Sequence, residues 1–428
     1  MATGTLKKRL ILDYGRTGLE IEVPKAVTTV IEPTHVPGAT DPAALLRQAV
    51  ENPTNSRPLR DCVSKGQRVA ISVCDITRPQ PRAEMLSAIF EALPHIPPED
   101  FVILIATGTH RANTEAELVD MLGPEIAGNY PILNHDGRDT KSLIRLPDAG
   151  NGVPVLLNRA WVEADVRITT GFVEPHLFAG FSGGPKLVAP GLAGLETIMV
   201  LHSSDRIRHP NAIWGITHGN PIHDDIRAIS QATGVDFSID VVLNRDKQIT
   251  GVFAGELFAE HALACKRAKA CAMQAVDAPF EVVVTTNSGY PLDQNLYQSV
   301  KGMRAAHRVV AEGGSIICAA ECSEGLPEHG SFSELLGRRG SPAELLEMID
   351  APDFGVPDQW QVQVQALVQM HAQVYLKSEG LTQEQVARAH MLPADDVSET
   401  IERTLADAGP DARLCVLPQG PQTIPFVA

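Results

Sequence analysis

The sequence lacks the features that mark membrane-spanning and secreted chains. Its 428 residues contain no run approaching 18 uninterrupted apolar residues, the length that a membrane-spanning helix requires. Basic residues near the start precede only a three-residue apolar run, Leu10–Leu12, so we expect no signal peptide. The seven cysteines are an odd number spread over a long chain, which is no disulfide framework and suits a reducing compartment. We therefore expect a cytoplasmic protein with no membrane partner.

The chain also lacks an excess of basic residues. Its 36 lysines and arginines are outnumbered by 52 aspartates and glutamates, which gives a formal net charge of −16 at pH 7. A nucleic-acid-binding protein needs a basic face, so we expect no nucleic-acid partner. An acidic chain can still hold a local basic pocket for a small anion. With 44% hydrophobic and 21% charged residues, the composition is that of a globular enzyme of two or three domains.

Zinc motifs and repeats are missing as well. Cys318 and Cys322 are separated by three residues, but no second cysteine or histidine pair follows closely at the spacing of a zinc site. We interpret them as buried, unreactive thiols at the end of a strand. The sequence contains no low-complexity tract and no short-period repeat.

Short apolar strands alternate with amphipathic helices along the chain. The first part predicts a hairpin at 9–24, strands at 67–73 and 101–106, and helices at 41–52, 81–93, 114–122 and 257–274. The second part predicts strands at 281–286, 314–320 and 413–418, and helices at 297–312, 360–376 and 382–390. Such an alternation indicates mostly parallel sheets covered on both faces.

We therefore expect the α/β class, with two α/β domains of mostly parallel sheets and the active site in the cleft between them. The N-terminal, cofactor-binding domain is expected over 1–273 and the C-terminal domain over 274–411. The tail at about 412–428 is a candidate to pack back on the first domain.

Polar side chains follow two of the expected strands. Asp75 and Arg78 lie in the loop after 67–73, and His110 lies in the loop after 101–106. Because ligands of parallel α/β sheets bind at the carboxyl ends of strands, these residues are candidates for a binding or catalytic site.

A glycine-rich segment lies near the middle of the chain. Residues 172–196 contain five glycines and three prolines, which allow close backbone approach to a ligand and stiffen the path, although a structural loop fits too. A Walker phosphate loop is excluded because Pro185 and Leu187 flank Lys186 where that motif needs Gly and Ser/Thr. A Rossmann fingerprint, Gly-x-Gly-x-x-Gly opening a helix, is absent.

Lys186 and three histidines are the reactive groups of these segments. A lysine in a tight, partly apolar loop can act as a nucleophile or as an anchor for a carbonyl-type group, although most lysines are solvated surface charges. His110 and His176 suit an acid and a base near neutral pH. His202 lies 16 residues after Lys186, and a lone histidine near a helix is more often a structural residue than a ligand. Sequence spacing alone does not bring these side chains together.

Five motifs in order resemble those of nickel-dependent lactate racemase and its relatives, enzymes that carry the nickel-pincer nucleotide. They are Asp75-Ile-Thr-Arg78-Pro, Gly108-Thr-His110-Arg, Glu174-Pro-His176-x-Phe-Ala-Gly-Phe-Ser-Gly-Gly-Pro-Lys186, His202, and Tyr297-Gln298-x-x-Lys301. The resemblance covers almost the whole chain, and the five motifs together are highly specific. It implies an isomerase, a 2-hydroxy acid racemase or epimerase.

The resemblance implies a Ni(II)-pyridinium-3,5-bisthiocarboxylic acid mononucleotide joined to Lys186 through a thioamide. One pyridinium carbon, two sulfurs and His202 would hold nickel, a donor set that suits square-planar Ni(II). Asp75, Ile76, Thr77 and Arg78 match the stretch that binds the mononucleotide. Separate cofactor-synthesis enzymes would have to act upstream.

The resemblance also assigns the remaining site residues. His110 and His176 match the acid/base pair of a proton-coupled hydride transfer at C2. Gln298 and Lys301 match residues that hold the substrate carboxylate, and Arg78 could also face it. Tyr297 and Trp360 match an apolar wall of the substrate pocket, with interdomain core as the alternative for Trp360.

Several alternatives stay open at this point. Tyr297 and Trp360 favour a small aliphatic acid such as lactate, whereas relatives with the same catalytic residues act on malate, aromatic hydroxy acids or sugar acids. A hydro-lyase or dehydrogenase acting on such acids is a second enzymatic hypothesis. A sensor of hydroxy acids or of the cofactor is a non-enzymatic one, and the presence of both His110 and His176 argues against it. The oligomeric state does not follow from the sequence.

Overall fold

Two six-stranded sheets organise the chain, one in each of two units. The computed structural model describes residues 6–327 and 330–428. The central unit comprises His35–Cys271, and the terminal unit joins Met1–Thr34 with Ala272–Ala428.

The sheet of the central unit has the strand order β13-β12-β9-β4-β5-β6. All neighbours are parallel except β12 and β13, which form an antiparallel edge. Its strands are β4 (Val69–Cys74), β5 (Phe101–Ala106), β6 (Ile132–Asn134), β9 (Val166–Phe172), β12 (Phe237–Leu243) and β13 (Ile249–Gly255). Two short antiparallel pairs lie outside it: β7 (Leu143–Leu146) with β8 (Val155–Asn158), and β10 (Pro175–His176) with β11 (Gly180–Phe181).

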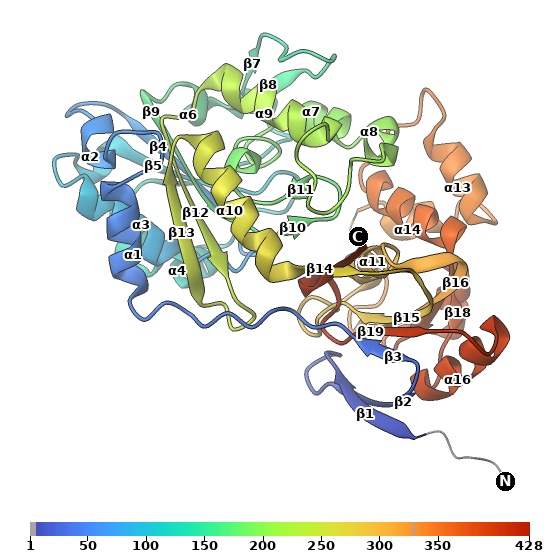
Figure 1. The fold of residues 1–428 in the computed structure, drawn as a ribbon. Coiled ribbons are helices and arrows are strands. Elements are labelled where there is room, and N and C mark those ends of the chain that lie inside the picture. Colours follow the sequence, from blue (N-terminus) through green and yellow to red (C-terminus); the bar gives the residue numbers. More distant parts are fainter. Residues whose placement is uncertain (1–5, 328–329) are drawn as a thin grey trace. The chain divides into compact units, whose positions relative to one another are not determined.

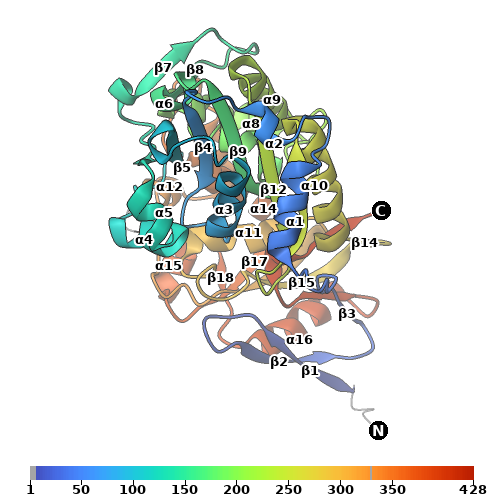
Figure 2. The ribbon, with the colours of Figure 1, turned by 90° about the vertical axis from the view of Figure 1, so that its left-hand side faces the viewer.

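Helices cover both faces of this sheet. The first face packs on α1 (Pro42–Glu51), α2 (Leu59–Cys62), α3 (Arg82–Ala92), α4 (Glu115–Leu122) and α5 (Pro124–Asn129) (Figure 2). The second face packs on α10 (Leu257–Ala272), as Figure 1 shows, and on the 3-10 turn η3 (Gly184–Leu187), which α9 (Pro221–Thr233) contacts. The remaining helices are α6 (Arg159–Val162), α7 (Leu195–Leu201) and α8 (Ser204–Arg208), and the remaining 3-10 turns are η1 (Pro98–Asp100) and η2 (Thr140–Ser142).

The sheet of the terminal unit has the order β18-β17-β16-β15-β19-β3 and is parallel throughout. Its strands are β3 (Thr28–Val30), β15 (Phe280–Thr286), β16 (Val310–Ala319), β17 (Gln373–Lys377), β18 (Leu392–Pro393) and β19 (Leu414–Leu417). The hairpin of β1 (Lys7–Leu12) and β2 (Leu19–Pro24) and the helix α16 (Val397–Ala408) cover one face. A further pair joins β14 (Met273–Val276) to β20 (Ile424–Val427).

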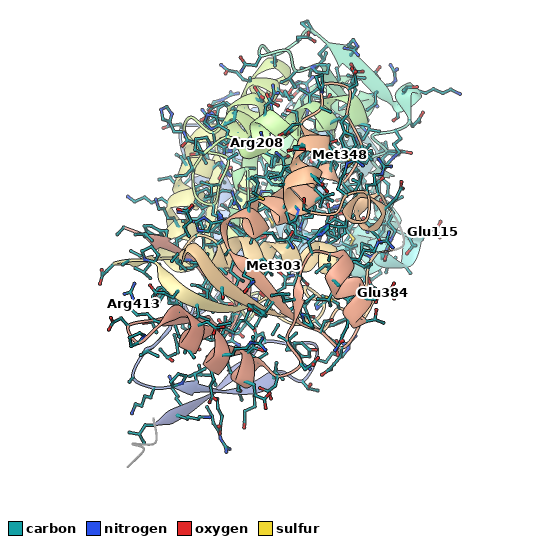
Figure 3. The ribbon with its side chains drawn as sticks, turned by 90° about the vertical axis from the view of Figure 1, so that its right-hand side faces the viewer. Glu115, Arg208, Met303, Met348, Glu384 and Arg413 are labelled. Atoms are coloured by element: carbon teal, nitrogen blue, oxygen red, sulfur yellow. The ribbon has the colours of Figure 1, made fainter. Side chains whose placement is uncertain are left out.

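The other face of this sheet packs on α11 (Leu296–Ala306) and α14 (Gln359–His371), and Met303 of α11 is fully buried there (Figure 3). The remaining elements are α12 (Phe332–Leu336), α13 (Pro342–Ile349), α15 (Gln383–Arg388) and η4 (Gly420–Gln422). In the described part of the chain, no helix is both long and apolar enough to cross a membrane.

The expected fold class, two α/β units with largely parallel sheets, is confirmed. The chain ends differ from the expected domain limits, because β3 and β19 pair within the sheet of the terminal unit and β20 pairs with β14. Residues 1–34 and the tail at 412–428 therefore belong with the second α/β unit, not with the first. Backbone pairing, which the sequence pattern does not reveal, decides their place.

Two predicted helices are too long. The helix expected to reach 312 ends at Ala306, and β16 begins at Val310. The helix expected over 360–376 ends at His371, and the run Gln373–Lys377, in which Val374 and Tyr375 favour a strand, forms β17 instead. Parallel pairing of β17 with β16 outweighs local helix propensity in this segment.

Candidate active site

Three neighbouring strands of the central unit end beside the candidate residues. Asp75 follows β4, His110 lies four residues after β5, and His176 lies four residues after β9. Because β9, β4 and β5 are parallel neighbours, their carboxyl ends meet at one edge of the sheet. The expectation that Asp75, Arg78 and His110 share this edge is confirmed, and His176 joins them there.

Asp75 and His110 form a hydrogen-bonded pair. His110 Nδ1 lies 2.6 Å from Asp75 Oδ2, and the Thr77 hydroxyl donates to Asp75 Oδ1 at 2.6 Å. The Asp75 side chain is 5% exposed, whereas that of His110 is 51% exposed. Burial alone would raise the pKa of Asp75, but the bonds from His110 and Thr77 and the nearby Arg78 charge bring it below its ordinary value. Asp75 is therefore an ionised acceptor, and His110 carries its proton on Nδ1.

Arg82, which the sequence analysis missed, holds the loop that carries Asp75. Its guanidinium donates to four backbone carbonyls, those of Cys74, Asp75, Arg78 and Gln80. The loop therefore presents Ile76 and Thr77 at the surface, leaves Arg78 half-buried, and keeps the Asp75 carboxylate inside. A buried arginine at the start of α3 gives no sequence signal that distinguishes it from a surface charge.

His176 is held by the backbone of its own loop. It lies in β10, and the N–H groups of Phe178 and Ala179 point at its Nδ1 over 3.5 and 3.2 Å. The pairing of β10 with β11 closes this short hairpin, and Gly180 has a φ of +81°, a conformation that glycine adopts without strain. Since Nδ1 accepts, the neutral His176 ring carries its proton on Nε2.

Lys186 lies in the 3-10 turn η3 and is half-buried. Ser72 Oγ donates to the Leu187 carbonyl at 2.7 Å, and Ser230 Oγ donates to the Pro185 carbonyl at 3.2 Å. The turn is thus fixed on both sides of the lysine. Burial lowers the pKa of both His202 and His223, and the positive charge of Lys186 adds to this lowering.

His202 ends helix α7 with a defined tautomer. Its Nδ1 lies 2.8 Å from the Ile198 carbonyl, so Nδ1 carries the proton and Nε2 holds the lone pair. Burial lowers the pKa of His202 to about 4, with the bond to Ile198 opposing this and the Lys186 charge adding to it. A neutral imidazole whose other nitrogen donates to a backbone carbonyl is the arrangement that metal-ligating histidines adopt.

The ring of Phe178 joins the two halves of this loop. It packs edge-on against His176 at 4.6 Å and against His202 at 5.1 Å between ring centroids. The structure therefore brings His176, His202 and Lys186 into one neighbourhood, which sequence spacing could not predict. Phe178 was missed because a lone aromatic in a loop does not reveal its neighbours.

The four candidates of the terminal unit cluster on α11 and α14. Lys301 Nζ donates to Gln298 Oε1 at 2.6 Å, one turn apart on α11. Trp360 Nε1 donates to the Tyr297 hydroxyl at 3.2 Å, and Gln361 Nε2 donates to the Tyr297 carbonyl at 2.6 Å. The structure thus pairs a polar couple, Gln298 with Lys301, and an aromatic couple, Tyr297 with Trp360.

Candidate metal ligands are few in the described residues. No three histidine, cysteine, aspartate or glutamate side chains there come together as a metal site. Cys318 and Cys322 are buried, with Cys318 in β16, and burial raises the pKa of both thiols. The interpretation of these cysteines as unreactive buried groups therefore agrees with their surroundings.

Known proteins match the chain along most of its length. Residues 14–215 match the family model of the lactate racemase N-terminal domain, and residues 275–424 match that of the lactate racemase C-terminal domain. Lactate racemase of Lactiplantibacillus plantarum is 36% identical over 379 residues, 88% of this chain and 89% of that protein. Lactate racemase of Thermoanaerobacterium thermosaccharolyticum is 33% identical over 384 residues, 89% of each chain.

Solved structures agree with these matches. The structure of the lactate racemase apoprotein from Thermoanaerobacterium thermosaccharolyticum aligns with a TM-score of 0.90 and 31% identity, over 98% of this chain and 100% of that one. A protein from Thermotoga maritima aligns with a TM-score of 0.63 over 90% of this chain and 97% of that one, but at 20% identity it shares the fold alone.

Proposed function

The chain belongs to the lactate racemase family, an isomerase family, and we propose from this that it inverts C2 of a short-chain 2-hydroxy acid of the lactate type. The resemblance seen in the sequence is thereby confirmed at the level of the family. The observation that carries the proposal is the opposite hydrogen bonding of two histidines, His110 and His176, at one edge of the sheet.

The two histidines start from complementary proton states. His110 donates through Nδ1 to Asp75, so its Nε2 is a proton acceptor. His176 accepts at Nδ1 from backbone N–H groups, so its Nε2 carries a proton to donate. A racemase needs two proton-transferring groups on opposite sides of the substrate, because the mirror-image substrates present their hydroxyl groups differently. One histidine would take the 2-hydroxyl proton, and the other would return a proton to the oxygen of the 2-oxo acid intermediate.

We further propose that the site takes a nickel-pincer nucleotide tethered to Lys186. The side chains fit this group, because His202 offers a neutral Nε2 lone pair and the Lys186 amine lies near it. When bound, the cofactor supplies a hydride acceptor and donor for C2 of the substrate. Asp75, Ile76, Thr77 and Arg78 are the proposed contacts of the mononucleotide.

For Asp75 we propose a more specific role than for the other residues of this stretch. Its two carboxylate oxygens already accept from His110 and Thr77, so its first function is to hold His110. Arg78 makes no ion pair shorter than 4.0 Å within the described residues, so its guanidinium can meet an anionic group of cofactor or substrate.

Gln298 and Lys301 are the proposed carboxylate contacts of the substrate. They already hydrogen-bond each other, which fixes the Lys301 ammonium at one place on α11. Tyr297 and Trp360 are proposed as the apolar wall against C3, and Trp360 is 6% exposed. Trp360 Nε1 is bonded to the Tyr297 hydroxyl, so this wall would offer the substrate mainly ring surface, which favours lactate over malate.

The test is a chiral assay of protein produced together with the cofactor-synthesis enzymes. We expect either pure enantiomer of lactate to become the racemate, without net release of 2-oxo acid. Malate, an aromatic hydroxy acid and a sugar acid serve as competing substrates. Faster inversion of one of these acids than of lactate would make that acid the substrate. Steady release of 2-oxo acid would indicate a dehydrogenase. Binding without turnover would indicate a sensor.

A further inference from the structure

Two carboxyl groups lie buried beneath the loop that carries Lys186. Asp240 of β12 and Glu260 of α10 are both 0% exposed. No cation pairs with either within the described residues. Buried charges without partners are costly, so a carboxyl pair retained here needs a reason.

The hydrogen bonds of the pair leave room for one shared proton. Asp240 Oδ1 accepts the Gly184 N–H at 3.2 Å, and Glu260 Oε1 accepts the Ser238 hydroxyl at 2.5 Å. The two carboxyl groups lie close enough for each to affect the pKa of the other, and Asp240 Oδ2 and Glu260 Oε2 are buried without a hydrogen-bond donor among the described residues. Burial raises the pKa of both groups, most strongly that of Glu260. A proton on Glu260 that is donated to an ionised Asp240 would give these two remaining oxygens their hydrogen bond.

The loop backbone is pressed against this pair and against the next residue of α10. A Cβ on Gly183 would lie 3.0 Å from Asp240 Oδ1, and a Cβ on Gly184 would lie 2.5 Å from the His261 ring. His261 Nε2 in turn donates to the Ser182 carbonyl at 2.9 Å. Gly183 and Gly184 have φ values of +74° and +48°, so both closeness and conformation require glycine there. Positions 183 and 184 are therefore glycines, because the backbone there packs directly against Asp240 and His261.

We propose that Asp240, with Glu260 as its proton-sharing partner, is a positioning residue that fixes the Lys186 loop and so the place of the Lys186 amine. The charge-assisted bond from Gly184 N–H to Asp240 anchors the loop two residues before the lysine. The effect on the attachment of the cofactor to Lys186 rests on the proposed function. The anchoring of the loop by Asp240 does not.

The first test measures the loop without any cofactor. In Asp240→Ala, amide hydrogen exchange of the 178–191 segment should rise about tenfold, the scale of one lost hydrogen bond to a charged group. Asp240→Asn keeps an oxygen for Gly184 and should exchange like the parent. Ile239→Ala is the matched control, because Ile239 is the strand neighbour and packs in the core on the opposite face of the sheet. Equal exchange in Asp240→Ala and the parent would overturn the anchoring.

The second test measures the shared proton. The infrared spectrum at neutral pH should show the C=O stretch of a protonated carboxyl, and Glu260→Gln should remove it while the loop keeps its slow exchange. The amide introduced by this substitution can donate to Asp240 in place of the proton. A parent spectrum without that band would show that the proton is not shared.

The third test measures the tether in protein made with the cofactor-synthesis enzymes. The fraction of chains with an adduct on Lys186, read by intact mass, should fall about tenfold in Asp240→Ala and remain near the parent in Asp240→Asn and Ile239→Ala. An adduct-free parent would refute the proposed cofactor. An adducted parent with equally adducted Asp240→Ala would refute the positioning role alone.

Discussion

The loops that carry His110 and His176 hold their imidazoles in opposite ways. The buried carboxylate of Asp75 accepts a hydrogen bond from Nδ1 of His110. At His176, backbone N–H groups donate hydrogen bonds to Nδ1 instead. The first ring is half exposed and controlled by a side chain, and the second is half-buried and controlled by the main chain. Two histidines at one edge of the sheet can therefore serve as a base and as an acid.

Removal of either imidazole should have the greatest consequence. His110→Ala and His176→Ala should each lower kcat by about a thousandfold, within the range of general acid–base catalysis, while nickel and the Lys186 adduct remain. The measurement combines the chiral assay with metal analysis. A variant that kept more than a tenth of the parent rate would remove that histidine from the acid–base pair.

A smaller effect is expected from the support of His110 alone. Asp75→Asn puts an amide N–H opposite Nδ1, which drives the proton of His110 to Nε2 and removes the base, so kcat should fall about a hundredfold. Adduct occupancy, measured on the same sample, separates this role from cofactor binding. Loss of the adduct with unchanged turnover per adducted chain would assign Asp75 to the mononucleotide instead.

Arg82 supports the loop on the His110 side, whereas Asn220 donates to the Phe178 carbonyl in the His176 loop. Arg82→Met leaves four carbonyls without their donor and should lower the free energy of unfolding by about 2 kcal/mol, as urea denaturation would measure. Arg111→Met is the matched control, because Arg111 is exposed and forms a surface ion pair with Glu117. Equal stability in the two variants would deny Arg82 its role.

The histidines behind the His176 loop should produce a weaker effect, a dependence of stability on pH. Burial lowers the pKa of His223 to about 3 and of His261 to about 4, below the ordinary value of roughly 6.5 in the unfolded chain. The unfolded state therefore binds more protons, and stability should fall as the pH drops from about 6.5 to 4. Asp240 and Glu260, with raised pKa values, act in the opposite direction.

His223→Asn should flatten this slope. Urea unfolding at pH 7 and pH 5 measures the difference between parent and variant. An identical slope in the variant would mean that the pKa of His223 is the same in the folded and the unfolded chain.

The sequence pattern predicted much of this fold for a physical reason. Strands such as β4 and β5 are continuous apolar runs followed by helices with clear starting residues, so local pattern and final structure agree. The segment 373–377 and the chain ends became strands through pairing with distant segments, which no local pattern encodes. The same holds for the site, where Lys186 and the histidines were visible but Phe178, Arg82 and Asp240 act through contacts across the fold.

The mass and nickel content of active protein test the proposed chemistry at its centre. The parent chain made with the cofactor-synthesis enzymes should carry one adduct on Lys186 and one nickel. His202→Ala should keep the adduct but lose most of the nickel. Lys186→Ala should lose the covalent adduct. Racemase activity in a parent chain that holds neither adduct nor nickel would contradict the proposed tether and the proposed metal.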